Sequence, residues 1–149
     1  MSSPSLLTAQ ERMESIKAGA IAAVAGGLTM ASLMAIEQSL LPQAVSAGPS
    51  LAIAAFCTFL FGVTYRYIVR ADVNPHLRSG AVGAFALVRG LSQIETLETP
   101  LAWQSAVLLG ESFALFAIAQ LVLAGAMQRS MLQPFGAAVP EAEASAQRG

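Results

Sequence analysis

The sequence predicts an all-α, polytopic membrane protein: a four-transmembrane-helix bundle with both termini cytoplasmic. Its composition predicts the class. Of the 149 residues, 55% are hydrophobic and only 11% are charged, whereas soluble domains carry about 25% charged residues. The chain also contains several apolar runs of the length that a membrane-spanning helix needs, about 20 residues. The same composition excludes a disordered chain, and the net charge of −1 excludes a nucleic-acid-binding protein.

Four segments qualify as spans, with predicted bounds 17–41, 51–69, 75–95 and 101–127. The first carries no charge between Ala18 and Ile36, and the second is apolar until Arg66. The third is the least apolar because Arg89 interrupts it, so an interfacial or re-entrant helix is the alternative there. The fourth contains Glu111.

Proline residues mark the ends of these segments. Pro49, Pro75 and Pro100 each stand where a helix is expected to begin, a position at which the missing N–H costs nothing. Pro42 and Pro134 follow the first and fourth spans, where a helix is expected to stop.

The distribution of basic residues predicts the orientation. Lys and Arg concentrate in cytoplasmic loops. With four spans, all basic residues except Arg89 fall on one face of the membrane, namely Arg12, Lys17, Arg66, Arg70, Arg78, Arg129 and Arg148. The opposite loops, 42–50 and 96–100, contain none. Both termini are therefore expected on the cytoplasmic side. Cleavage of the first span as a signal peptide after residues 45–47 is the alternative.

The two ends of the chain are polar. Residues 1–16 are expected to form an N-terminal tail, in which the apolar spacing of 6–16 also fits a short helix lying on the membrane. Residues 128–149 are rich in Ala, Glu and Gly, a composition typical of a disordered C-terminal tail.

Small residues recur at helical spacing in two spans. Gly19 and Gly27 share one face of the first span, and Gly80 and Gly90 lie in the third. Small residues let membrane helices approach closely. These positions predict either tight packing within the bundle or a face on which another protein docks.

Arg89 and Glu111 are the strongest functional candidates. A charge at the bilayer centre costs at least about 2.5–3.5 kcal/mol, so it is normally paired or functional. The third and fourth spans form a tight hairpin that would bring the two residues to depths differing by roughly 6 Å, which predicts a salt bridge. Such a pair can fix helix register, form a site for a proton, ion, lipid head group or cofactor, or pair with a partner subunit. Its polar neighbours along the same half of the bundle are Gln93, Gln104, Glu37 and Glu95.

The connection between the second and third spans is the other candidate site. It gathers Arg66, Arg70, Asp72, His76 and Arg78. This set suits anionic lipid head groups or an acidic partner, or simply anchors the cytoplasmic face. With a single Cys and a single His, one chain cannot assemble a zinc finger, a CxxC pair or a two-His metal site. No metal and no cofactor are predicted, although a bound pigment or lipid stays open.

Part of the chain resembles a known group of proteins. The stretch 61–95 carries Tyr65-Arg66-Tyr67, Asp72, Asn74, His76-Leu77-Arg78, Gly80-Ala81-Val82 and Leu87-Val88-Arg89-Gly90-Leu91. In these residues it resembles uncharacterised small four-helix integral membrane proteins of cyanobacteria and chloroplasts. The resemblance implies a photosynthetic membrane and supplies no catalytic residues.

Three functions are compatible with these patterns. The leading expectation is a non-enzymatic accessory, assembly or stabilising factor of a larger, photosynthetic membrane complex, embedded in a thylakoid or a bacterial inner membrane. It would contact lipid and either a membrane-protein partner or further copies of itself. The alternative is a small oligomeric transporter or channel that uses a buried Arg89/Glu111 polar site. A membrane-embedded enzyme is the least favoured reading, because no catalytic constellation stands out.

Overall fold

The structure is a computed structural model that describes residues 9–40, 47–69, 75–98 and 101–133. Every regular element in this part of the chain is an α-helix, which confirms the predicted all-α class. The four helices are α1 (Ala9–Leu40), α2 (Ala47–Ile68), α3 (Pro75–Glu95) and α4 (Ala102–Gln128).

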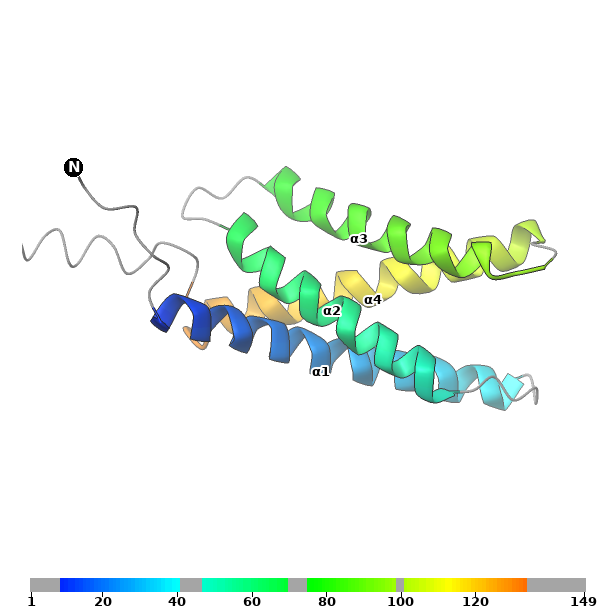
Figure 1. Cartoon of the computed structure of the whole chain (residues 1–149), viewed down its shortest axis with the longest axis horizontal. Helices are drawn as coiled ribbons and strands as arrows, with labels where there is room; N and C mark the ends of the chain where they lie inside the picture. The colour runs from blue at the N-terminus through cyan, green and yellow to red at the C-terminus, as the bar shows by residue number, and fades with distance from the viewer. Residues whose placement is uncertain (1–8, 41–46, 70–74, 99–100, 134–149) are drawn as a thin grey trace, which may run out of the picture.

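The helices form two antiparallel hairpins, α1–α2 and α3–α4, which meet mainly through α1 and α4 (Figure 1). The start of α1, the end of α2, the start of α3 and the end of α4 lie at one end of the molecule. We call this the terminal end. The end of α1, the start of α2 and the turn between α3 and α4 lie at the other, which we call the turn end (Figure 1). Toward the turn end the two hairpins diverge.

The helix bounds differ from the predicted spans mostly at the N-terminal side. The first helix begins at Ala9 rather than at residue 17, so part of the predicted polar tail continues α1. Helix-favouring residues and the acidic Glu11 in the first turn, where the helix dipole stabilises a carboxylate, explain this start. With 32 residues α1 is about 48 Å long, well beyond the roughly 30 Å of a hydrocarbon core.

The chain beyond α4 also belongs to the fold. Ser130 adopts a left-handed φ of 57°, and its N–H donates to the carbonyl of Met127 while the N–H of Met131 donates to that of Ala126. This is the Schellman arrangement that ends many helices. It turns the chain back so that Leu132 is only 1% exposed. Residues 128–133, which were expected to belong to the disordered tail 128–149, are therefore part of the fold; residues 134–149 lie outside the described part.

Three of the helices are long and apolar enough to cross a membrane: Ala9–Ile36 of α1, Gly48–Ile68 of α2 and Ala102–Gln128 of α4. Their outer surfaces are apolar as well. Leu28, Ile53 and Leu121, for example, are each more than half exposed. In the described part of the chain, α3 does not meet the same criterion. These features define a membrane protein with at least three candidate spans.

The hairpin α1–α2 is held by small residues. Ala18, Ala22 and Gly26 are buried on one face of α1, and Gly62 of α2 lies so close that a Cβ there would be 2.6 Å from the carbonyl oxygen of Ala18. Such close approach of two backbones is typical of membrane helices.

Aromatic rings fill the centre of the bundle. Phe61 of α2 contacts Phe85 of α3 and Phe116 of α4, with ring centroids 5.4 and 5.3 Å apart. Phe85 and Phe116 are themselves 5.6 Å apart. Tyr65 lies one turn from Phe61 and is also fully buried. We call these four residues the aromatic cluster; it joins the two hairpins between the terminal end and the point where they diverge.

Candidate functional site

The structure brings Arg89 and Glu111 together. Both guanidinium Nη atoms of Arg89 lie 3.2 Å from Oε1 of Glu111, and both side chains are nearly enclosed, at 6% and 9% exposed. Because α3 and α4 are antiparallel and joined by a short turn, positions at similar distances from that turn face one another. The pair therefore crosses the α3–α4 interface inside the bundle.

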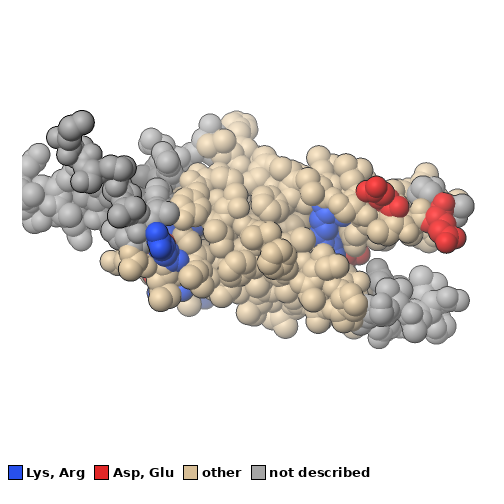
Figure 2. All heavy atoms as spheres, viewed as in Figure 1, with Lys and Arg blue, Asp and Glu red and all other residues tan. Residues whose placement is uncertain are grey.

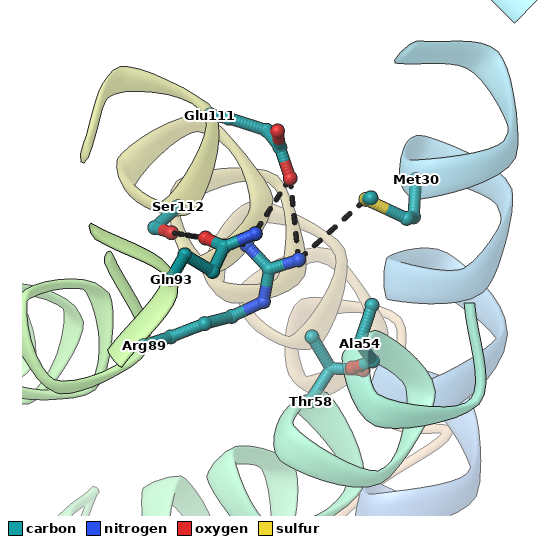
Figure 3. Close-up of polar contacts among 7 residues, drawn as sticks. All are labelled: Met30, Ala54, Thr58, Arg89, Gln93, Glu111 and Ser112. Atoms are coloured by element: carbon teal, nitrogen blue, oxygen red, sulfur yellow. Dashed lines mark hydrogen bonds and ion pairs between the residues drawn. The ribbon is translucent and has the colours of Figure 1, made fainter. Parts of the chain in front are cut away.

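Other side chains complete the contacts of Arg89 (Figure 3). Its Nη1 donates to Oε1 of Gln93, one turn further along α3, and to Oγ of Ser112 on α4. Ser112 in turn donates to Gln93. The second Nη lies 3.6 Å from Sδ of Met30 on α1. We call Arg89, Gln93, Glu111 and Ser112 the Arg89 cluster.

All four helices surround this guanidinium. In the close-up, Thr58 and Ala54 of α2 lie on the side opposite Glu111, and the Thr58 hydroxyl donates to the Ala54 carbonyl (Figure 3). The only unbonded nitrogen of Arg89 is Nε, which is enclosed and has no partner among the described residues. A fixed positive charge with one carboxylate and two neutral acceptors is well compensated in a low-dielectric environment.

A large cleft opens from the Arg89 cluster toward the turn end. Its volume is about 1020 Å³. It lies where the two hairpins diverge, and Figure 2 shows charged side chains of both signs meeting at its inner end, apart from those at the two ends of the molecule. Its lining comes from all four helices: Met30 and Met34 (α1); Ser50, Ile53, Cys57 and Leu60 (α2); Phe85, Val88, Arg89, Ser92 and Gln93 (α3), then Thr96 and Leu97; and Trp103, Gln104, Val107, Leu108, Glu111 and Phe116 (α4).

The other predicted polar neighbours of the Arg89–Glu111 pair do not all line the cleft. Gln104 also lines the cleft, and its Oε1 accepts a 3.4 Å bond from the backbone N–H of Leu101, so it helps to begin α4. Glu95 is exposed at the end of α3. Glu37 is in α1, but its side chain lies outside the described residues. The structure thus adds Gln93 and Gln104 to the polar lining but not Glu95.

The four predicted packing glycines divide into two groups. A Cβ on Gly19 would lie 2.7 Å from the ring of Phe59, and one on Gly90 would lie 2.7 Å from Leu109, so both face a neighbouring helix. A Cβ on Gly27 or Gly80 would meet no atom within 4 Å. Gly19 and Gly90 therefore pack the hairpins, whereas Gly27 and Gly80 face outward.

A second buried cation, at the terminal end, has a role different from the predicted one. Arg66 was expected in a surface set that faces anionic head groups or an acidic partner, or that anchors the cytoplasmic face, but it is 2% exposed. Its Nη1 donates to the Glu11 carbonyl and to the Ser15 hydroxyl, both at 2.6 Å, and its Nε donates to the Gln133 carbonyl at 3.0 Å. Arg66 thereby fastens α2 to the start of α1 and to the segment after α4. We call these four residues the Arg66 cluster.

The other residues of the predicted cytoplasmic site remain at the surface or undescribed. His76 is exposed and Arg78 is half-buried, both in the first turn of α3. Arg70 and Asp72 lie outside the described residues, so the full five-residue set is not assembled here. Within the described ranges, His, Cys, Asp and Glu side chains form no group that could hold a metal ion.

The fold and the cleft define a class: an all-helical membrane protein with a polar cluster enclosed among its four helices. Comparison with protein families, with curated proteins and with solved structures found no match for this chain.

Proposed function

We propose that this chain is a non-enzymatic accessory protein of a larger membrane complex, with four membrane-spanning helices and both termini on the cytoplasmic side. The resemblance of residues 61–95 to small proteins of photosynthetic membranes suggests a thylakoid or bacterial inner membrane. The proposal depends on three structural features, which concern the third span, the orientation and the docking face.

The side chains of α3 support its placement in the membrane. An amphipathic helix in water turns its charge outward, yet α3 encloses Arg89 and exposes apolar residues instead. Val88 is 68% exposed and Leu91 is 56% exposed. The polar residues of α3 lie at its ends (His76, Arg78, Ser79 and Glu95) or line the cleft (Arg89, Ser92 and Gln93), so the apolar outer surface between them suits lipid or another membrane helix.

Charge supports the orientation. Apart from Arg89, the described basic residues lie at the terminal end; they are Arg12, Lys17, Arg66, Arg78 and Arg129. Glu95 and Glu98 lie at the turn end. On the face shown in Figure 2, basic and acidic side chains gather at opposite ends accordingly. The excess of Lys and Arg marks the cytoplasmic side.

The outer face of α3 carries the proposed accessory role. Gly80, Gly83 and Ala84 form a shallow notch there, and Leu87 and Leu91 continue the same face one and two turns later. A Cβ on Gly80 or Gly83 would meet no atom within 4 Å. Small residues next to large apolar ones are typical of faces on which membrane helices associate. A partner helix there would also cover the least apolar helix of the bundle.

The test is migration of the tagged chain from mildly solubilised membranes on native gels. The proposal expects the wild-type chain to run with a larger complex and Gly80→Leu to run alone with an unchanged melting temperature. Gly110→Leu is the matched control, because Gly110 also faces open space but on α4. A wild-type chain that runs as a monomer or a small homo-oligomer would contradict the accessory role.

The Arg89 cluster favours a second candidate, an oligomeric transporter, because its charge pair lines a cleft that is open at one end. Against passage through one bundle, Phe85 and Phe116 line the cleft and pack against the buried ring of Phe61. Proton or ion flux into liposomes that contain the protein distinguishes a transporter from an accessory protein. Transport requires Glu111→Gln to abolish flux in a protein that still folds, whereas an accessory protein gives no flux in either form.

A further inference from the structure

The size of the cleft indicates what kind of molecule fits it. Binding sites for small molecules range over roughly 300–1,000 Å³, and the cleft holds about 1020 Å³. One lipid-sized molecule therefore fits this space.

The walls of the cleft are apolar, and its rim faces the surface proposed to contact lipid. Ile53 of α2, Val88 of α3 and Val107 of α4 line the cleft and are each more than half exposed. An occupant that enters from the bilayer would keep an apolar chain against these residues. The walls thus select for a hydrocarbon chain.

The inner end offers unused hydrogen-bonding groups of both kinds. Oε1 of Glu111 accepts both bonds from Arg89, which leaves Oε2 without a partner among the described residues. Oε1 of Gln93 faces Arg89 and Ser112, and Oε1 of Gln104 faces the N–H of Leu101. The amide nitrogens of the two glutamines therefore remain as donors without a bond in the described structure. None of these three atoms is among the fully enclosed unbonded atoms of the described residues, so a molecule in the cleft can reach them.

The net charge of the lining decides the charge of the head group. Among the described residues of the lining, Arg89 and Glu111 alone carry a full charge, and they neutralise each other. An anionic head group would face the carboxylate and a cationic one the guanidinium, each at a desolvation cost. An uncharged group with an oxygen that donates or accepts hydrogen bonds meets neither penalty.

We propose that the cleft binds one uncharged, single-chain lipid whose hydroxyl or carbonyl head group lies against Glu111, Gln93 and Gln104. This inference shares the membrane placement proposed above but not the partner on α3, so either can fail without the other. The ligand class is defined by the chemistry of the lining: a long apolar chain, a small polar head and no charge.

The chain contains its own reporter for this site. Trp103 is the only tryptophan and lines the cleft. The experiment measures its fluorescence in zwitterionic nanodiscs as brominated lipid is added. Two probes share one chain and differ in the head group: 1-(9,10-dibromostearoyl)glycerol, which is uncharged, and 9,10-dibromostearate, which is anionic.

The expected result is saturable quenching by the glycerol ester, with an affinity about tenfold higher than for the anion, because the anion loses its hydration beside the Glu111 carboxylate. Glu111→Gln leaves the lining with a net positive charge, so it should reverse the preference toward dibromostearate. Linear, equal quenching by both probes would overturn the proposal, as would a folded Glu111→Gln protein with unchanged preference.

A second variant keeps the test decisive if Glu111→Gln does not fold. Ile53→Phe narrows the cleft without touching the charge pair, because Ile53 lines the rim and is 57% exposed. It should weaken binding of the glycerol ester about tenfold. Leu121→Phe is the matched control, since Leu121 is 70% exposed on α4 and lies outside the lining. Equal binding by the two phenylalanine variants would refute a ligand in the cleft.

Discussion

The pairing of Arg89 with Glu111 makes a quantitative prediction about stability. Removing one partner of a buried ion pair costs about 3–5 kcal/mol, because it leaves the other charge uncompensated. Arg89 is 6% exposed and both of its Nη atoms bond to a single carboxylate oxygen of Glu111. Glu111→Gln should therefore lower the free energy of unfolding by about 3–5 kcal/mol, a large part of the 5–15 kcal/mol that a typical domain has.

The double variant separates the pair from its surroundings. Arg89→Met together with Glu111→Gln removes both charges and fills the space with side chains of similar length. We expect it to cost no more than Glu111→Gln alone, so the coupling energy of the cycle should be about 2 kcal/mol or more. Gln93 and Ser112 can then bond to each other and to the new amide, as their present contact suggests.

The assay is reversible unfolding in mixed micelles by titration with dodecyl sulfate, followed by far-ultraviolet circular dichroism. Glu95→Gln is the matched control, because Glu95 is also a glutamate but is exposed, at the end of α3; it should change the free energy of unfolding by less than about 0.5 kcal/mol. If the two single changes add to within about 0.5 kcal/mol in the double variant, the two residues are not coupled and the reasoning is refuted.

Three further predictions concern the fold. Gly62→Ala should lower the free energy of unfolding by about 1–3 kcal/mol, because its new methyl group would meet the backbone of α1. Gly110→Ala, whose methyl group would meet no atom, should leave stability unchanged or raise it. The melting temperatures of the two variants test this difference. Leu132→Ala should cost about 2–5 kcal/mol in the same assay, while Met131→Ala, at an exposed neighbour, should change little; equal effects would show that the segment after α4 does not pack. Arg66→Gln should release that segment, so limited proteolysis should remove the C-terminal residues faster than in the wild-type chain, and an unchanged rate would contradict the clasp.

The helices were predictable because their signals are local. Long apolar runs and the prolines at their ends can be read directly from the sequence. They predict α3 with the same bounds, Pro75–Glu95, that the structure gives. The charge pair was predictable for a related reason. A short turn fixes which residues of an antiparallel hairpin lie at equal depth, so Arg89 and Glu111 follow from counting.

The rotation of each helix about its axis was not predictable in the same way. The apolar part of α1 carries hydrophobic residues on every side, so its pattern does not mark an inner face. Gly19 and Gly27 share one face in the sequence pattern, yet the structure buries Gly19 together with Ala18, Ala22 and Gly26 and leaves Gly27 facing open space. Gly26, one residue or about 100° around the helix from Gly27, takes the packed position. The face of α1 that is buried depends on its fit against Gly62 of α2. A pattern within α1 cannot show that fit.

The role of Arg66 was missed for the opposite reason. An arginine at the end of a span normally reaches for head groups, and the local sequence gives no other signal. In the structure its acceptors are two backbone carbonyls and a serine hydroxyl, supplied by the start of α1 and by the segment after α4. Backbone carbonyls exist at every residue, so sequence cannot show which of them a buried guanidinium will use.

The two arginines together explain why the cleft lies where it does. At the terminal end, the Arg66 cluster, Leu132 and the aromatic cluster join the hairpins through many contacts. Toward the turn end, the Arg89 cluster belongs to the α3–α4 hairpin and reaches the other hairpin through the contact of Arg89 with Met30, near where the hairpins diverge (Figures 1 and 3). Regions with fewer buried contacts open at lower free energy than the core. The cleft can therefore widen to admit a molecule by loosening the turn end alone, while the clasp at the terminal end keeps the bundle assembled. The two buried arginines thus have different roles because they lie at different places along the bundle. Arg66 fastens the helices at the terminal end, and Arg89 borders the cleft.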